Sequence, residues 1–282
     1  MKKSVHILSF IFSFLIVFSC EPSRAENGDL LNGIKELEIE NGEGTTSSRL
    51  LVKMISHSKD EDTGEWVDET FNYKYANRKL ISYEGDFTEK TNFEYNTNNK
   101  ISKIVATGQT SSLEYLGGNV SKISTDIAGV AKINATYIYT SGKLSRVISI
   151  QEYTLPVPTK LYLETTYEYN GENMVKSNIK NGIYLPNGTL EMNPMEDQEL
   201  IFTYDNKKSP YKLLPKEFII WLAGIGPQGA AYLSTNNVKT YSIKVGGNSE
   251  PALTYNHEYD TEDYLIKSSN NAGETIKYEY LK

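Results

Sequence analysis

Histidine, cysteine and carboxylate side chains are the residues of this sequence that could take part in acid–base, nucleophilic or metal chemistry. The histidines are His6, His57 and His257, and their spacing does not match the paired ligands of a helical zinc site. Glutamates such as Glu94 recur beside tyrosines at alternating positions, which predicts that they face solvent. The sequence contains no nucleophile elbow, phosphate loop or dinucleotide fingerprint. We therefore predict a protein that is not an enzyme, with no catalytic residue, cofactor or metal site.

The single cysteine, Cys20, follows an apolar run at the N-terminus. Lys2 and Lys3 precede this run, residues 7–18, which has the length of a signal-peptide core and is too short to cross a bilayer. We therefore predict a signal peptide over residues 1–19. The junction at Cys20 resembles the lipobox of bacterial lipoproteins, which implies that the thiol is acylated and unable to form a disulfide.

The residues after Cys20 predict a tether and a location. Residues 20–30 are polar, contain Pro22 and Gly28, and are typical of a flexible linker. Their acidic character is similar to the export signals of surface lipoproteins in Bacteroidota. We expect an outer-membrane lipoprotein of the cell envelope, held to the membrane through acyl chains on Cys20, on either the periplasmic or the cell-surface face. The formal charge of −7 argues against nucleic acid as a partner.

A sequence unit of about 20 residues recurs along the chain, and "TNFEYNTNNKISKI", from Thr91, is representative. Each unit has an aromatic or apolar residue, any residue, a tyrosine, a polar linker and an aliphatic residue. Residues two apart share one face of a strand, and linkers rich in Asn, Gly and Asp suit hairpin turns. Each unit therefore predicts a β-hairpin that buries its tyrosine side. The anchoring tyrosines are Tyr75, Tyr95, Tyr115, Tyr139, Tyr169, Tyr204, Tyr259 and Tyr280.

These hairpins predict an all-β fold. We expect one β-hairpin-repeat domain over residues 31–282, an antiparallel meander forming a twisted or curled sheet that is open or a half-barrel. "RLLVKMISH" and "EWVDETFNYKY" predict a further hairpin, and "TIKYEYLK" is a terminal unit. Ile101 and Ile104 would point to opposite faces of a regular strand, so either a β-bulge separates them or both faces are covered.

The repeated unit resembles the YD-repeat (Rhs-like) family. "YDNKKSPY", from Tyr204, and "YDTEDYLIK", from Tyr259, carry the resemblance best, which covers roughly residues 71–282. The chain looks most similar to Bacteroidota lipoproteins of unknown function with degenerate YD-like units. The resemblance implies a hairpin architecture and assigns no activity.

Residues 209–237 interrupt the repeat. "KEFIIWLA" after Pro215 predicts one short helix near residues 216–223. Phe218, Trp221 and Leu222 are too apolar for a free loop. They either plug the apolar face of the sheet or form a lid that contacts a ligand or partner, and they are the candidate ligand-binding residues.

The sequence favours a membrane-anchored, non-catalytic binding or interaction module with a protein or glycan partner, because tyrosines on a β-surface suit both. One alternative is a carrier of a lipid or small hydrophobic ligand inside the curled sheet. A second is a glycan hydrolase whose paired carboxylates are assembled by folding.

Overall fold

The computed structural model describes residues 49–60, 63–86, 88–155, 157–224 and 227–282, and the predicted signal peptide, Cys20 and tether lie outside them. Arg49–Lys282 form one compact unit. Its strands are β1 (Leu50–Lys59), β2 (Trp66–Ala76), β3 (Lys79–Gly85), β4 (Thr91–Tyr95), β5 (Ile101–Ala106), β6 (Gln109–Leu116), β7 (Asn119–Ile127), β8 (Ala131–Thr140), β9 (Lys143–Tyr153), β10 (Thr159–Asn170), β11 (Asn173–Tyr184), β12 (Leu190–Met192), β13 (Gln198–Lys208), β14 (Asn236–Val245), β15 (Asn248–Ser249), β16 (Leu253–Tyr259), β17 (Leu265–Asn270) and β18 (Thr275–Leu281). The helices are α2 (Lys216–Ala223) and the 3₁₀ turns η2 (Pro194–Glu196), η3 (Pro210–Leu213) and η4 (Pro227–Leu233).

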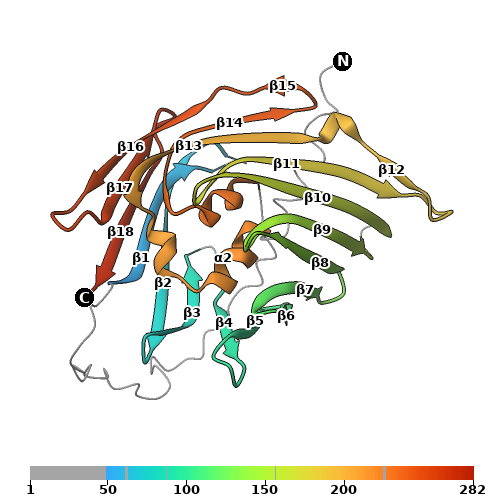
Figure 1. The fold of residues 1–282 in the computed structure, drawn as a ribbon, viewed down its shortest axis with the longest axis horizontal. Coiled ribbons are helices and arrows are strands. Elements are labelled where there is room, and N and C mark those ends of the chain that lie inside the picture. The colour runs from blue at the N-terminus through green and yellow to red at the C-terminus, as the bar shows by residue number, and fades with distance from the viewer. Residues whose placement is uncertain (1–48, 61–62, 87, 156, 225–226) are drawn as a thin grey trace. The chain divides into compact units, whose positions relative to one another are not determined.

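The strands form one antiparallel sheet that closes on itself (Figure 1). Neighbours in sequence pair from β1 to β11, and the ladder continues through β13, β14, β16, β17 and β18. β18 then pairs with β1 from Leu50–Leu281 to His57–Thr275. Because β12 and β15 are short flanking strands, sixteen strands make up the closed barrel in the described part of the chain.

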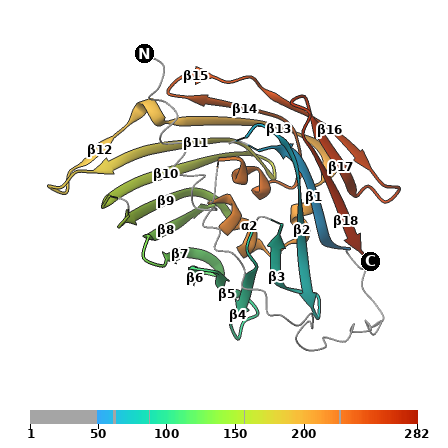
Figure 2. The ribbon, with the colours of Figure 1, turned by 180° about the vertical axis from the view of Figure 1, so that it is seen from behind.

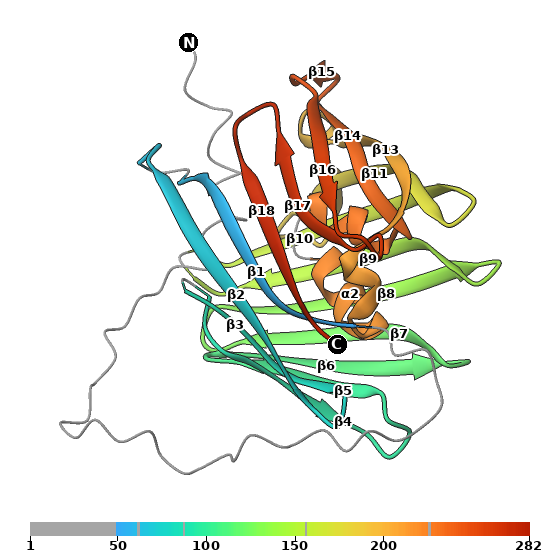
Figure 3. The ribbon, with the colours of Figure 1, turned by 90° about the vertical axis from the view of Figure 1, so that its left-hand side faces the viewer.

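The prediction of an open or half-barrel sheet was therefore wrong. The overturning finding is the β1–β18 seam, where β1, β2 and β18 lie side by side (Figure 3). This pairing joins the two ends of the described chain, and a local pattern of hairpins contains no information about which distant strand completes the last one.

A β-bulge recurs in the hairpins and places the aliphatic residues inside the barrel. Tyr95 pairs with Ile101 and Glu94 pairs with Lys103, so Ser102 is the extra residue. Ile101 and Ile104 are consequently both buried, which decides between the two alternatives in favour of the bulge. The same register shift follows the other tyrosine–aliphatic pairs, namely Tyr75–Leu80, Tyr115–Val120, Tyr139–Leu144, Tyr169–Met174 and Tyr259–Leu265.

Five of the anchoring tyrosines, Tyr75, Tyr95, Tyr115, Tyr204 and Tyr280, also donate a hydrogen bond to a backbone carbonyl of a preceding or neighbouring unit. Tyr95 donates a hydrogen bond from its hydroxyl to the Leu80 carbonyl at 2.8 Å, and Tyr115 donates to the Ile101 carbonyl. Burial, with a smaller contribution from the Glu217 carboxylate, raises the pKa of Tyr95 to about 12. The phenol therefore stays protonated and able to donate at neutral pH.

The β1–β18 seam has the geometry of one such unit, divided between the two ends of the described chain. Tyr280 pairs with Leu51, and a register shift at Val52 follows, as in the internal hairpins. Tyr280 donates to the Leu265 carbonyl at 2.6 Å, and Tyr75 donates to the Leu51 carbonyl at 2.8 Å. β1 thus supplies the return strand that the terminal "TIKYEYLK" unit lacks.

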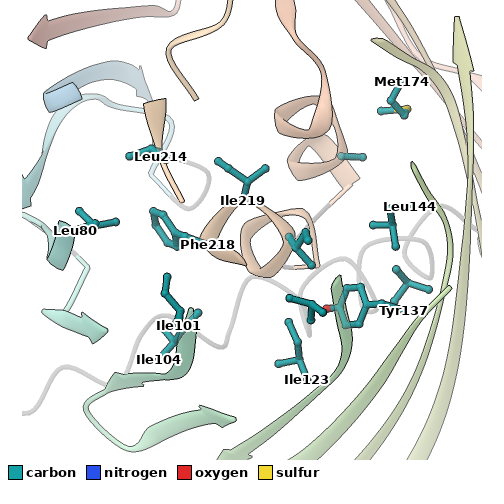
Figure 4. Packing of buried hydrophobic residues seen from close by; sticks show 14 of the residues in the cluster. Leu80, Ile101, Ile104, Ile123, Tyr137, Leu144, Met174, Leu214, Phe218 and Ile219 are labelled. Carbon is teal, nitrogen blue, oxygen red and sulfur yellow. The ribbon is translucent and has the colours of Figure 1, made fainter. Parts of the chain in front are cut away.

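The segment between β13 and β14 fills the barrel. α2 occupies the predicted residues and lies inside the ring (Figures 1 and 4). Phe218 is fully buried, with its ring centroid 4.9 Å from that of Phe93 and 5.5 Å from that of Tyr83. A ring of sixteen strands is too wide for wall side chains alone to fill. The inserted helix therefore completes the core.

The seam should contribute to stability as an intact hairpin does. We expect Leu51→Ala to lower the free energy of unfolding by about 2–5 kcal/mol, because the side chain is fully buried and its loss leaves a cavity. Leu80→Ala, the equivalent change inside a continuous hairpin, is the matched control. Urea titration should give similar losses, whereas a negligible effect of Leu51→Ala would show that closure contributes little.

Candidate binding groove

The barrel wall splits between β11 and β13. β11 pairs with β13 as far as the Ile179–Gln198 pair, and beyond it β11 pairs with β12. Asn181 bridges the split. Its backbone N–H donates to Asp197 Oδ1 at 3.1 Å, and its side-chain amide donates to the Glu196 carbonyl at 2.7 Å. Beyond the Ile179–Gln198 pair, these polar contacts therefore take the place of the β11–β13 ladder.

A groove of about 540 Å³ lies at this split. This volume falls within the usual range for small-molecule sites. The groove is lined by Glu164, Thr166, Asn178, Ile179, Lys180, Asp197, Gln198, Glu199, Lys244 and Gly247.

Most of the polar side chains of the groove belong to the outer face of the wall. Tyr167 on β10 and Leu200 on β13 are buried in the core, and successive strand residues alternate between faces. Glu164, Thr166 and Glu199 therefore point outward. The groove opens on the outside of the barrel, away from the core.

Glu199 is fixed by two lysines. Its carboxylate oxygens lie 2.7 Å from Lys176 Nζ and 2.8 Å from Lys244 Nζ. The hydrogen bonds from these two ammonium groups lower the pKa of Glu199 to about 2. The residue is therefore ionised and held in one position at neutral pH.

Glu164 is fixed in a similar way on the neighbouring strand. Tyr162 donates a hydrogen bond to its Oε2 at 2.8 Å, and Arg146 Nε lies 2.7 Å from its Oε1. Burial alone would raise the pKa of Glu164, but the Tyr162 hydrogen bond and the Arg146 contact lower it overall. Both glutamates of the groove thus have their charges matched by neighbouring cations.

This arrangement suits recognition of a polar ligand better than acid catalysis. A glycoside hydrolase requires a carboxylic acid whose pKa is raised so that it can donate a proton. Glu164 and Glu199 have lowered pKa values instead. Thr166 and Asn178 add a hydroxyl and an amide on the outer face, whereas Gln198 shares the inner face of Leu200, and its Oε1 is buried with no partner among the described residues.

A second, smaller cavity lies inside the barrel. It has a volume of about 120 Å³ and is lined by aromatic residues, including Tyr211, Tyr232, Tyr278 and His257, together with aliphatic and polar side chains. The Tyr211 and Tyr232 rings contact each other with centroids 4.1 Å apart. A cavity of this size is well below that of a typical ligand site and far too small for a lipid.

The three candidate residues on α2 lie in the filled interior rather than at the groove. Phe218 is fully buried, while Trp221 and Leu222 are partly buried and pack against the core. Trp221 Nε1 donates to Ser111 Oγ at 3.1 Å. Their proposed part in ligand binding stays a prediction. Cys20 lies outside the described residues.

The histidines occupy different environments. His57 is on the outer face, stacked on Trp66 and 2.7 Å from Asp68 Oδ1, whereas His257 donates from Nε2 to the Val238 carbonyl at 2.8 Å and borders the inner cavity. Within the described ranges, no three or more His, Cys, Asp or Glu side chains form a metal-binding group.

Sequence reasoning did not find the groove residues. Two of their strands, β10 and β11, are the longest in the described part of the fold, and the step from Tyr169 to Tyr204 is longer than the first steps of 20 residues. That lengthening was the available signal that the wall is irregular here.

Fold and groove together define a closed antiparallel barrel with a filled, apolar interior and a polar groove on its outer wall. No protein-family model matches the chain, and no curated protein matches it. The chain is similar to a solved structure described as a porin-like protein from Bacteroides uniformis, at 13% identity and a TM-score of 0.41. The match covers 82% of this chain and 98% of that one. A likeness this distant carries no inference about function.

No helix among the residues that the structure describes has both the length and the apolar character to span a membrane.

The Glu199 network should make stability depend on acid. A depressed pKa means that the ionised group stabilises the fold above its ordinary value of 4.5 and loses this effect as the pH falls toward 2. We expect Glu199→Gln to cost about 1 kcal/mol at pH 7 and almost nothing near pH 2, measured by urea unfolding at both values. Glu94→Gln, which removes a single contact of 3.5 Å to Lys103, should change less. Equal losses at both pH values would contradict the assignment.

Proposed function

We propose that this protein is a lipid-anchored binding module of the bacterial cell envelope that holds a neutral glycan in its outer groove without modifying it. The observation that carries the proposal is the groove itself, an outward-facing site whose two glutamates, Glu164 and Glu199, are already paired with cations. Its fixed hydroxyl, amide and carboxylate groups match the donors and acceptors of a sugar.

The charged side chains of the outer wall favour a barrel that is surrounded by water. Lysines and glutamates pair across neighbouring strands on this face, as in Lys122–Glu114 at 3.5 Å and Lys267–Glu258 at 2.9 Å. Membrane-embedded barrels have the reverse arrangement, with an apolar band outside and polar residues inside. Attachment through an acylated Cys20, rather than insertion of the wall, is the form of membrane association that fits this surface.

An aromatic side chain adjoins the groove. Tyr162 lies on the outer face of β10 and pairs with Gly182 of β11, over which Leu190 and Met192 of β12 pack. Its hydroxyl is fixed by the hydrogen bond to Glu164. A sugar ring placed against Tyr162 would reach the groove's polar groups, and stacking of this kind is a common use of tyrosine at binding surfaces.

The alternatives receive less support. A carrier of a lipid needs an internal space, and the cavity found among the described residues is about 120 Å³. A hydrolase needs a protonated carboxyl group, and the groove glutamates are paired with cations. We retain the degenerate YD-like lipoprotein as the kind of protein proposed, at the outer membrane, on its periplasmic or cell-surface face.

Glycan binding should depend on the groove amide and hydroxyl. We expect Asn178→Ala and Thr166→Ala each to weaken binding about tenfold, because each removes a hydrogen-bonding group from the site. A glycan array would identify the ligand, and calorimetry would measure the change. Asn92→Ala, an exposed asparagine on β4, is the control and should have no effect. Binding that is indifferent to both groove changes, or no glycan bound by the parent, would refute the proposal.

Anchoring should depend on the thiol of Cys20. Cys20→Ser should abolish incorporation of radiolabelled palmitate and release the protein from the membrane fraction, because the acyl chains supply the hydrophobic attachment. Cys20 is the sole cysteine, so label in the parent can be assigned to it. Continued incorporation of palmitate by the variant would contradict a lipid anchor at Cys20.

A further inference from the structure

Two neighbouring loops at one end of the barrel expose apolar side chains. The β9–β10 loop exposes 59% of Leu155 and 66% of Val157, and the β11–β12 loop exposes 36% of Leu185. The loops are adjacent because β10 pairs with both β9 and β11, and Figure 2 shows the β11–β12 hairpin projecting beside the end of β10. We name Leu155, Val157 and Leu185 the apolar rim.

The apolar rim is uncharged in a chain that is acidic. Between Tyr153 and Leu163 the one charged residue is Lys160, and residues 181–190 contain none. Lys160 is paired with Glu152 at 2.7 Å and lies over the Tyr184 ring at 5.2 Å. Other loops at this end carry carboxylates, among them Asp60, Asp86, Glu250 and Glu274. The β5–β6 turn at Thr107 and Gly108 and the β7–β8 turn at residues 128–130 also lack acidic residues, so the exposed apolar side chains, rather than the lack of charge alone, distinguish the two loops of the apolar rim.

Several polar backbone groups at the tips form hydrogen bonds within the loops. The Leu185 N–H donates to the Thr189 carbonyl at 2.9 Å, and the Gly188 N–H donates to the Leu185 carbonyl at 2.8 Å. Gly188 has a φ of 84°, which this turn requires and which glycine adopts without strain. In the other loop, Thr159 Oγ1 donates to the Val157 carbonyl at 3.0 Å. Tips with internal hydrogen bonds can leave water at a smaller cost than open loops.

We propose that the apolar rim inserts into the surface of a lipid bilayer. The side chains project from convex loop tips, a shape that a fluid interface can accommodate without a complementary cavity. Tyr153 and Tyr184 flank the tips, as tyrosines do at the boundary between lipid and water. Insertion would be shallow, because the charged residues Glu152 and Lys160 lie only three residues from Leu155 and Val157, respectively.

The chain's own geometry allows this contact together with an anchor at Cys20. Arg49 lies at the opposite end of the barrel, where it pairs with Asp260 in the β16–β17 turn. The chain from Cys20 to Ser48 could span at most on the order of 100 Å if extended. The longest strands have 12 residues and measure roughly 40 Å. The segment from Cys20 to Ser48 is therefore long enough to pass the length of the barrel, so that the apolar rim can face the membrane.

A tryptophan placed in the apolar rim would report insertion. Val157→Trp and the control Leu116→Trp both replace exposed apolar residues, but Leu116 is the last residue of β6, at the other end of the barrel. Each variant would be bound to vesicles of phosphatidylethanolamine and phosphatidylglycerol containing a brominated phosphatidylcholine. The tryptophan at position 157 should shift to shorter emission wavelength and be quenched roughly twofold more than that at position 116. Trp66 and Trp221 contribute equally to both and are removed by subtracting the parent signal.

Charged residues in the apolar rim should remove this difference. Adding Leu155→Asp and Leu185→Asp to Val157→Trp should return its quenching to the level of the control. Equal quenching at positions 157 and 116 would overturn the proposal. A wavelength shift without quenching would also overturn it, because the apolar rim would then be covered by protein. Glycan binding is measured without vesicles, so failure of one proposal leaves the other standing.

Discussion

Pairing of β18 with β1 is the interaction on which the rest of the structure depends. A sheet of hairpins with two free edges leaves unpaired N–H and C=O groups along both, and such edges recruit other chains. The seam removes both edges at once by joining Tyr280 to Leu51 in the register of an internal hairpin. Arg49 strengthens this end, since it pairs with Asp260 and Glu262 and lies 4.5 Å from the centroid of the Tyr264 ring. The two ends of the described chain are thus structural parts of the wall.

Closure in turn explains the insertion between β13 and β14. Sixteen strands enclose more space than their own inward side chains can occupy, and an empty apolar interior would lose the contacts that stabilise the fold. Phe218, Ile219 and Ile220 of α2 fill that space and are buried against wall residues such as Ile104 and Ile123 (Figure 4). An open sheet would need a cover over one face, whereas the closed sheet needs a filler. The same apolar segment suits either, which is why its sequence did not distinguish them.

The hairpins could be predicted from the sequence because each is local. An aromatic residue two positions before a tyrosine, a polar turn and an aliphatic return residue lie within about 20 residues, and each preference supports the others. The sequence could not decide whether a bulge occurs at Ser102, because serine suits either geometry. The pairing of Tyr95 with Ile101 and of Glu94 with Lys103 shows that it does. The groove could not be predicted for a different reason. It exists where β11 leaves β13, and Asn181, Glu196 and Asp197 hold that split through contacts that no repeat pattern encodes.

The distribution of charge decides which surfaces of this barrel can meet lipid. Outward side chains of the wall include cross-strand ion pairs such as Lys74–Glu84, and moving such pairs into hydrocarbon would cost far more than their mutual attraction returns. A wall of this kind excludes the bilayer even though it closes as membrane barrels do. Membrane contact is then restricted to a covalent lipid or to uncharged loops with internally bonded backbone. Topology therefore does not determine whether a barrel spans a membrane; the direction in which its apolar side chains point does, and here the main apolar cluster lies inside the barrel, around α2.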